Sequence, residues 1–148
     1  MGTFAESVAT LAKQLGWAAE QLHEDQVRIQ VPADAGETVP VYIRPCGEMH
    51  GREVLELSSR GLRLPEEDAS KMPLLILALQ RNADVLFGHW GLDEEDEASI
   101  LRVFHSQLTE TMDLAELKAA AMAGADEFSR LAQGLDDILT QERRTLVP

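Results

Sequence analysis

Apolar residues recur at two different spacings along the first part of the chain. From Phe4 to Leu22 they stand three or four positions apart, which predicts an amphipathic helix that ends near His23. Apolar and polar residues then alternate in three segments, which predicts half-buried strands at 27–31, 39–43 and 54–58. The connections between these segments are short, so we expect the three strands to form an antiparallel meander.

Six consecutive apolar residues at 74–79 are the most distinctive feature of the sequence. They belong to a predicted helix that has Ser70 as its candidate N-cap, Pro73 in its first turn and Asn82 near its end. A helix in a small domain normally has one apolar stripe and one polar face. This helix is apolar all round, so we expect the sheet to cover one side and a second copy of the chain or a bound partner to cover the other.

The last part of the chain predicts two more strands and a closing helix. The strands are expected at 85–92 and 100–108, and the acidic segment at 93–97 is expected to be the turn between them. Asp113 and Glu116 fit a capping box, which predicts the start of a helix directly after Asp113. Apolar residues continue at helical spacing behind this start, so we expect the helix to be long.

These elements define the fold class. The sequence predicts an α+β fold in which a single antiparallel sheet of about five strands packs with three helices, in the order α-β-β-β-α-β-β-α. Strands do not alternate one for one with helices, so a parallel doubly wound sheet is not expected. Residues 1–141 are expected to form one domain, and residues 142–148 a flexible tail.

The charge balance limits the kinds of partner. Acidic residues number 26 and basic residues 13, which gives a net charge of −13. Nucleic acid and anionic membranes are therefore poor partners, because binding phosphate depends on neutralising it with cations. Cys46 is the single cysteine, so neither an internal disulfide nor a multi-cysteine zinc site can form. The N-terminus lacks a signal-peptide pattern and the 74–79 run is too short to span a bilayer, so we expect a cytoplasmic protein.

Motifs for catalysis and cofactor binding are absent from the sequence. It has no glycine-rich phosphate loop and no G-x-S-x-G nucleophile elbow. His89 and His105 can approach each other if the last two strands pair, but two histidines alone make a poor metal site. We therefore predict no enzyme, no cofactor and no metal. The minor alternative is an enzyme that uses Glu56, His89 or His105.

The acidic segment has a partial likeness to a calcium loop. Oxygen ligands at 93, 95 and 97 match the start of an EF-hand, but that loop requires a glycine where Ala98 stands and a glutamate where Phe104 stands. The segment is also expected between strands, whereas an EF-hand loop lies between helices. A solvated hairpin turn explains it better.

Candidate binding residues come from three segments. A proline within the 39–43 strand indicates an edge position or a bulge, and at an edge an extended partner could add a strand. Tryptophan is enriched in protein interfaces, which adds one candidate anchor. With the outer side of the central helix, these segments give the candidate partner or dimer interface: Leu75, Leu79, Val39, Val41, Ile43 and Trp90.

Two segments carry a resemblance to a known family. They are MPLLILALQRNADVLFGHWGLDEED at 72–96 and MDLAELKAAAMAGADEFSRL at 112–131. A helix that ends in Asn82, then a short strand around Gly91-Leu92-Asp93, then an acidic hairpin and a closing helix, resembles the type III secretion chaperone-like superfamily. Two branches are candidates: the acidic effector chaperones of the CesT/SycE type, and the YbjN-like proteins, which are described as sensory transduction regulators.

The resemblance implies an α+β fold, a homodimer and no enzymatic activity. In the chaperone branch, an extended stretch of a client protein wraps over apolar patches and can add to the sheet. One departure is the segment ILRVFHSQLTETMD at 100–113, which is more polar than the strand expected there. Our interpretation is a non-enzymatic protein-binding module of the chaperone type. The alternative is a YbjN-like regulator that acts through protein contacts, and the residues do not decide between the two.

Overall fold

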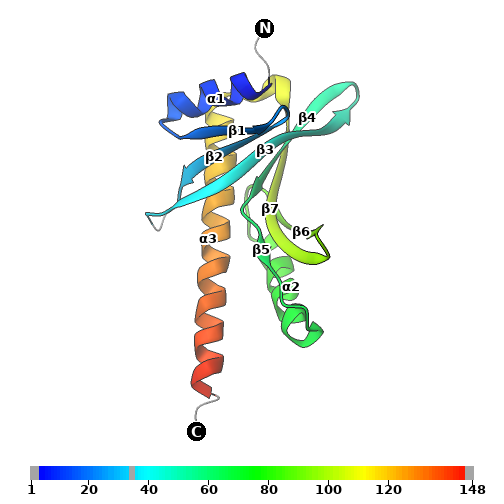
Figure 1. The fold of residues 1–148 in the computed structure, drawn as a ribbon, viewed down its shortest axis with the longest axis vertical. Coiled ribbons are helices and arrows are strands. Elements are labelled where there is room, and N and C mark those ends of the chain that lie inside the picture. Colours follow the sequence, from blue (N-terminus) through cyan, green and yellow to red (C-terminus); the bar gives the residue numbers. More distant parts are fainter. Residues whose placement is uncertain (1–3, 34–35, 146–148) are drawn as a thin grey trace.

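The computed structural model describes residues 4–33 and 36–145, with side chains up to Leu135. This part of the chain forms three α-helices, one short 3-10 helix and seven strands of a single curled sheet (Figure 1). The elements in chain order are α1 (Phe4–Leu15), β1 (Ala19–His23), β2 (Gln26–Pro32), β3 (Thr38–Met49), β4 (Arg52–Ser59), β5 (Leu62–Arg63), α2 (Asp68–Asn82), β6 (His89–Glu95), β7 (Ala98–Leu108), the 3-10 turn Thr109–Thr111 and α3 (Leu114–Thr145). The predicted α+β class is confirmed, and β1 and β5 are two strands that the sequence pattern missed.

The first helix is shorter than the apolar spacing predicts. It ends at Leu15 because Gly16 adopts a left-handed conformation with φ of 77°. The Trp17 amide then donates a hydrogen bond to the Ala12 carbonyl at 2.9 Å, which closes the last turn. The segment Ala19–His23 leaves the helix and pairs with β2 as a strand. The prediction of a helix up to His23 is therefore wrong.

Helix α2 begins earlier than predicted. Its N-cap position is Glu67, which makes no side-chain capping bond, and Ser70 lies inside the first turn of the helix. Acidic residues are favourable near a helix N-terminus because they complement the helix dipole, so Glu67 and Asp68 suit this start. Pro73 is tolerated within the helix, which ends at Asn82 as expected.

The hairpin of β6 and β7 has a tighter turn than the sequence suggests. Strand β6 begins at His89, so residues 85–88 form a loop rather than the start of the strand. The reversal takes place at Asp96 and Glu97, which both have positive φ angles of 49° and 66°. The strands extend on both sides of this turn to Glu95 and Ala98.

The start of α3 confirms the predicted capping box. The Glu116 amide donates to Asp113 Oδ1 at 2.8 Å, and the Asp113 amide donates to Glu116 Oε2 at 3.1 Å. The helix runs to Thr145 and so includes the first part of the predicted tail, whereas residues 146–148 lie outside the described residues.

Every strand pairing in the described sheet is antiparallel. The strands lie in the order β1-β2-β3-β4-β7, and β7 also pairs with β5 and β6. Because β4 and β6 both pair with Phe104 of β7, they must lie on opposite edges of β7. Among the described strands, β1, β6 and the short β5 therefore lie at the edges of the sheet. Strand β3 lies between β2 and β4, so the predicted edge position of Pro40 is wrong. A proline is tolerated here because the pairing of β3 with β4 ends at Val41 and Ser59, and no backbone N–H of residue 40 is needed on the β4 side.

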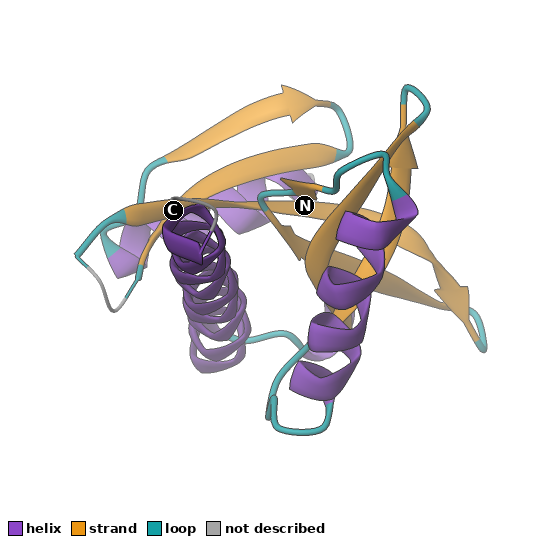
Figure 2. Cartoon of the chain, turned by 90° about the horizontal axis from the view of Figure 1, so that it is seen from below, coloured by secondary structure: helices purple, strands orange, loops and turns teal. Residues whose placement is uncertain are grey.

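All three helices lie toward one face of the sheet, and the other face is left without a helical cover (Figures 1 and 2). A first core lies where α1 and the beginning of α3 pack on β2, β3 and β4. A second core lies between α2, the hairpin of β6 and β7, and the middle of α3. The first core is built mostly from small and β-branched residues, among them Ala5, Val8, Ala12, Ile29, Ile43, Ala121 and Ala125.

Candidate functional site

Helix α2 is apolar on two opposite sides. Leu74 and Ala78 point into the second core, where they are buried with Trp90 and with Leu101 and Val103 of β7. Only these two residues of the helix are buried, and Leu75 and Leu77 are half-buried beside them. The protomer therefore covers one side of this helix.

The solvent side of α2 carries a row of large aliphatic residues. Met72, Ile76 and Leu79 are 51%, 50% and 69% exposed. Their spacing of four and three residues places them on one helical face, about half a turn from Leu74 and Ala78. We name these three residues the α2 strip. Single exposed apolar residues are common on protein surfaces, but an aligned row of them is typical of an interaction site.

A buried ion pair fastens α2 to the rest of the molecule. Arg81 makes two hydrogen bonds to the Glu127 carboxylate of α3, Nε to Oε1 at 2.8 Å and Nη2 to Oε2 at 2.7 Å. The indole Nε1 of Trp90 donates to the same carboxylate at 2.9 Å. Asn82 also bonds the backbone of Trp90, with its Oδ1 accepting from the amide at 2.5 Å. We name Arg81, Trp90 and Glu127 the α2 clamp.

The protonation state of the clamp follows from these contacts. Burial alone would raise the pKa of the Glu127 carboxyl, but the hydrogen bonds from Arg81 and Trp90 outweigh burial and hold this pKa below its usual value. The same contact raises the pKa of Arg81. Glu127 is therefore ionised at neutral pH, and the bidentate pair is charge-assisted. Sequence reasoning missed this cluster because its members lie 46 positions apart and belong to no local pattern.

The loop between α2 and β6 adds two more apolar residues to the surface. Leu86 is 95% exposed, and Phe87 is partly exposed with its ring 5.9 Å from the ring of His105. Gly88 must be a glycine here, since it has φ of 77° and an added Cβ would come within 2.8 Å of the Phe104 carbonyl oxygen.

Beside Phe87 lies an open hollow at the edge of β7. Its volume is about 470 Å³, and its lining includes Phe87, His105, Gln107, Ala115 and Ala119. The pairing of β6 with β7 stops at His89 and Phe104, so none of the described strands pairs with the next residues of β7 on that side. We name this region the β7 edge hollow. It offers an unpaired strand edge next to apolar side chains, which is the arrangement that binds extended peptides.

The predicted interface residues fall into two groups. Leu79 is exposed on the α2 strip and Leu75 is half-buried at its flank, so both lie where the sequence placed them on the central helix. Val39, Val41 and Ile43 are buried in the first core on an interior strand, and Trp90 is buried in the second core. These four side chains are covered by the protomer itself. Met72, Ile76 and Leu86 were not among the predicted residues, although the helical spacing of the first two was a usable signal.

The side chains weighed for catalysis do not converge. His89 is in register with Phe104, so the alternation of β7 places His105 on the opposite face of the sheet. Glu56 is instead paired with Arg44 on the face without helices. In the described ranges, no group of three or more histidine, cysteine or acidic residues could hold a metal ion. Among the helices described, none has the length and apolar character needed to cross a membrane.

Comparison with known proteins assigns the family. A family model described as "YbjN: Putative bacterial sensory transduction regulator" matches residues 5–137. No curated protein and no solved structure shows significant similarity to the chain. The match includes α1, the whole sheet and most of α3, so it covers both cores, the α2 strip and the α2 clamp. The chain belongs to the YbjN family, which is part of the type III secretion chaperone-like fold group.

Proposed function

We propose that this chain is a non-enzymatic bacterial regulator that works through protein contacts in the cytoplasm. The observation that carries the proposal is the α2 strip, because Met72, Ile76 and Leu79 form an aliphatic row on the side of α2 that the protomer leaves open. Burying a large aliphatic side chain contributes roughly 1.5–3 kcal/mol, so covering this row is a substantial driving force for association.

The first occupant that we propose for the α2 strip is a second copy of the chain. The family resemblance implies a homodimer, and two α2 helices packed antiparallel would bury the strip symmetrically. In such a pair the two helix dipoles would run in opposite directions, which is their favourable arrangement.

The β7 edge hollow supports a second contact, to a regulatory partner. Its unpaired strand edge and the exposed Phe87 suit an extended segment of another protein, which would add a strand along residues 105–108. A chaperone that binds an extended client would use the same feature, and this is the second candidate function. The family match favours the regulator over the chaperone.

Light scattering during size-exclusion chromatography tests the role of the α2 strip. We expect the wild-type chain to run as a dimer at micromolar concentration and Leu79→Glu to run as a monomer, because the charge cannot be buried unpaired in an apolar interface. The matched control is Met49→Glu, which also places a charge at an exposed apolar side chain, but far away at the end of β3, next to the turn into β4. It should stay a dimer.

The contrary outcomes are equally specific. A monomeric wild-type chain would contradict the homodimer, and a dimer that survives Leu79→Glu would place the interface elsewhere. The protein-binding proposal would then be tested by comparing the proteins that the two variants retain from a cytoplasmic extract. A partner lost with Leu79→Glu and kept with Met49→Glu supports the proposal. Identical sets contradict it.

A further inference from the structure

The face of the sheet without helices contains an open hollow of about 300 Å³, which we name the sheet hollow. Its lining comes from five neighbouring strands, β2, β3, β4, β7 and β6. The pairing register puts Tyr42 opposite Ser58, and Ser58 opposite Phe104. These three residues therefore form one row across the middle of the hollow, with the small side chain of Ser58 between two aromatic rings.

The two rings lean away from Ser58 and leave it as the floor. The Phe104 ring lies over Gly91 of β6, where an added Cβ would come within 2.8 Å of two ring carbons. Tyr42 lies on the other side, near Arg28 of β2, and contributes after Glu20 to the raised pKa of that guanidinium. The hollow is open because Gly91 leaves room for the Phe104 ring on one side and Arg28 interacts with Tyr42 on the other.

Ser58 is a mostly buried residue whose hydroxyl opens onto the sheet hollow. The residue is 8% exposed, and among the described residues its hydroxyl makes no hydrogen bond. No fully buried side-chain oxygen or nitrogen of the described residues lacks a partner, so this hydroxyl keeps contact with solvent and can bond to water or to a ligand. Since Ser58 lines the sheet hollow, a molecule placed there can supply the missing partner.

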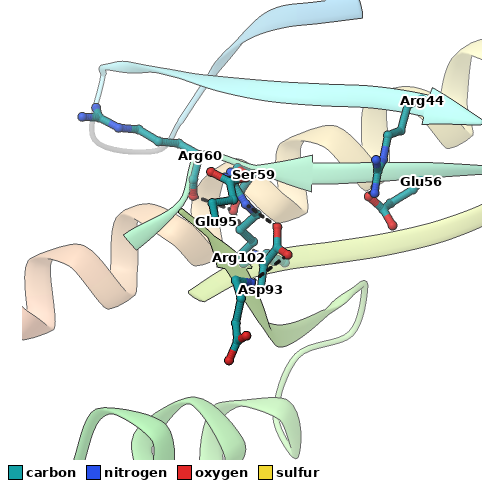
Figure 3. Close-up of polar contacts among 9 residues, drawn as sticks. Arg44, Glu56, Ser59, Arg60, Asp93, Glu95 and Arg102 are labelled. Carbon is teal, nitrogen blue, oxygen red and sulfur yellow. Dashed lines mark hydrogen bonds and ion pairs between the residues drawn. The ribbon is translucent and has the colours of Figure 1, made fainter. Parts of the chain in front are cut away.

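Ion pairs lie on either side of this row along the strands, and Figure 3 shows them. Arg44 Nε is 3.1 Å from Glu56 Oε1 on one side. On the other side Arg102 reaches Glu95 Oε1 at 2.7 Å and Asp93 Oδ2 at 3.5 Å. The sheet hollow therefore holds one carboxylate more than it holds guanidinium groups. The net charge of −13 on the whole chain adds to this local excess, so the field favours a cation and opposes an anion.

We propose that the sheet hollow binds a small organic cation, an aliphatic di- or triamine. The excess carboxylate attracts an ammonium group, the faces of Tyr42 and Phe104 attract it through their quadrupoles, and the Ser58 hydroxyl accepts one of its hydrogen bonds. An inorganic cation fits less well, because the carboxylates are already bonded to arginines and the described residues offer no metal-holding cluster. This proposal does not depend on the α2 strip, which lies on the helical side of the sheet.

Titration of the isotope-labelled chain with spermidine, followed by amide chemical shifts at physiological salt, tests the proposal. We expect saturable shifts confined to the strands around Tyr42, Ser58 and Phe104. Asp93→Asn removes the excess charge at an exposed position and should weaken binding about tenfold, the effect of losing one charged contact. Ser58→Phe fills the floor and should abolish binding. Its own spectrum reports whether the variant is folded.

The matched control is Glu94→Gln, which removes one charge from the same strand but on its opposite face. It should bind spermidine within about twofold of the wild type, because the Glu94 side chain faces away from the hollow and solvent screens its charge. Shifts spread over the whole acidic surface without saturation would overturn the proposal. Equal weakening by Glu94→Gln and Asp93→Asn would also overturn it, because spermidine would then be a general counterion.

Discussion

The two cores of this molecule are held in different ways. The first core packs α1 and α3 closely on the sheet through small and β-branched residues and is closed on both sides by the protomer. The second core contains fewer residues and includes the buried Trp90. The α2 clamp ties its helix α2 to α3 through an ion pair. Its helix also leaves an aliphatic row in solvent. The difference indicates that the first core maintains the fold and that the second core holds α2 so that its aliphatic row faces the solvent.

A matched pair of truncations gives the largest expected contrast between the cores. Leu55→Ala in the first core should lower the free energy of unfolding by about 4 kcal/mol, because a fully enclosed site cannot collapse around the cavity. Leu74→Ala in the second core should cost about 2 kcal/mol, since α2 can shift toward the gap. Urea denaturation of both variants measures the contrast. Equal losses would mean that the two cores are equally rigid.

Breaking the α2 clamp should have the next largest effect. Glu127→Gln keeps the shape of the side chain but removes its charge, and leaves Arg81 partly buried without a counter-ion. We expect a loss of about 2 kcal/mol. Hydrogen exchange should become faster in α2 and stay unchanged in α1. Equal acceleration in both helices would show that α2 is not a separately held element.

The clamp also predicts a pH dependence with a definite sign. The pKa of Glu127 is lower in the folded state than in the unfolded chain, so its contribution is complete above the unfolded value and is lost as pH falls through the folded one. The stability gap between the wild type and Glu127→Gln should therefore be full at neutral pH and close below about pH 4. A gap that persists unchanged in acid would contradict an ionised Glu127.

Loss of the helix cap at the start of α3, next to the first core, should have a smaller effect. Asp113→Ala removes the acceptor for the Glu116 amide at the start of α3 and should cost about 1 kcal/mol. Thr111→Ala is the control, because its hydroxyl only bonds the Leu108 carbonyl at 3.4 Å. Thermal unfolding compares the two. If Thr111→Ala were as unstable as Asp113→Ala, the capping box would not be the cause of the lost stability.

The smallest expected effect on protomer stability is that of Leu79→Glu. An exposed substitution should change the free energy of unfolding of the isolated protomer by less than about 0.5 kcal/mol. Wild-type stability should nevertheless rise with protein concentration, since association favours the folded state, whereas the stability of the variant should not. Urea midpoints at two protein concentrations measure this. Concentration dependence that is the same in both chains would contradict an interface on the α2 strip.

Local patterns predicted much of this fold. The alternation of apolar residues identified β2, β3 and β4, and the Asp113–Glu116 spacing identified the start of α3, because in these segments near neighbours decide the structure. The boundary of α1 was missed, since a single glycine overrides an apolar period that continues past it. The interior position of β3 was also missed, because proline fits an interior strand where the neighbouring ladder has ended.

Long-range contacts explain what the sequence could not predict of the candidate sites. The apolar run at 74–79 correctly indicated a helix with apolar residues on opposite sides, and the exposed row confirms that the protomer hides only part of it. The α2 clamp and the sheet hollow depend instead on partners from distant elements, such as Arg81 with Glu127, and on pairing register. No spacing in the sequence reveals such combinations.

Solvent access at the α2 strip is the most direct test of the account. A soluble gadolinium chelate accelerates the relaxation of methyl groups that it can approach, and the exposed methyl of Met49 provides an internal reference. At concentrations where the chain is expected to be a dimer, the account predicts that the methyl groups of Ile76 and Leu79 relax much less than that of Met49. Relaxation of Ile76 and Leu79 as fast as that of Met49 would show that no second copy covers the strip, and would contradict the central claim.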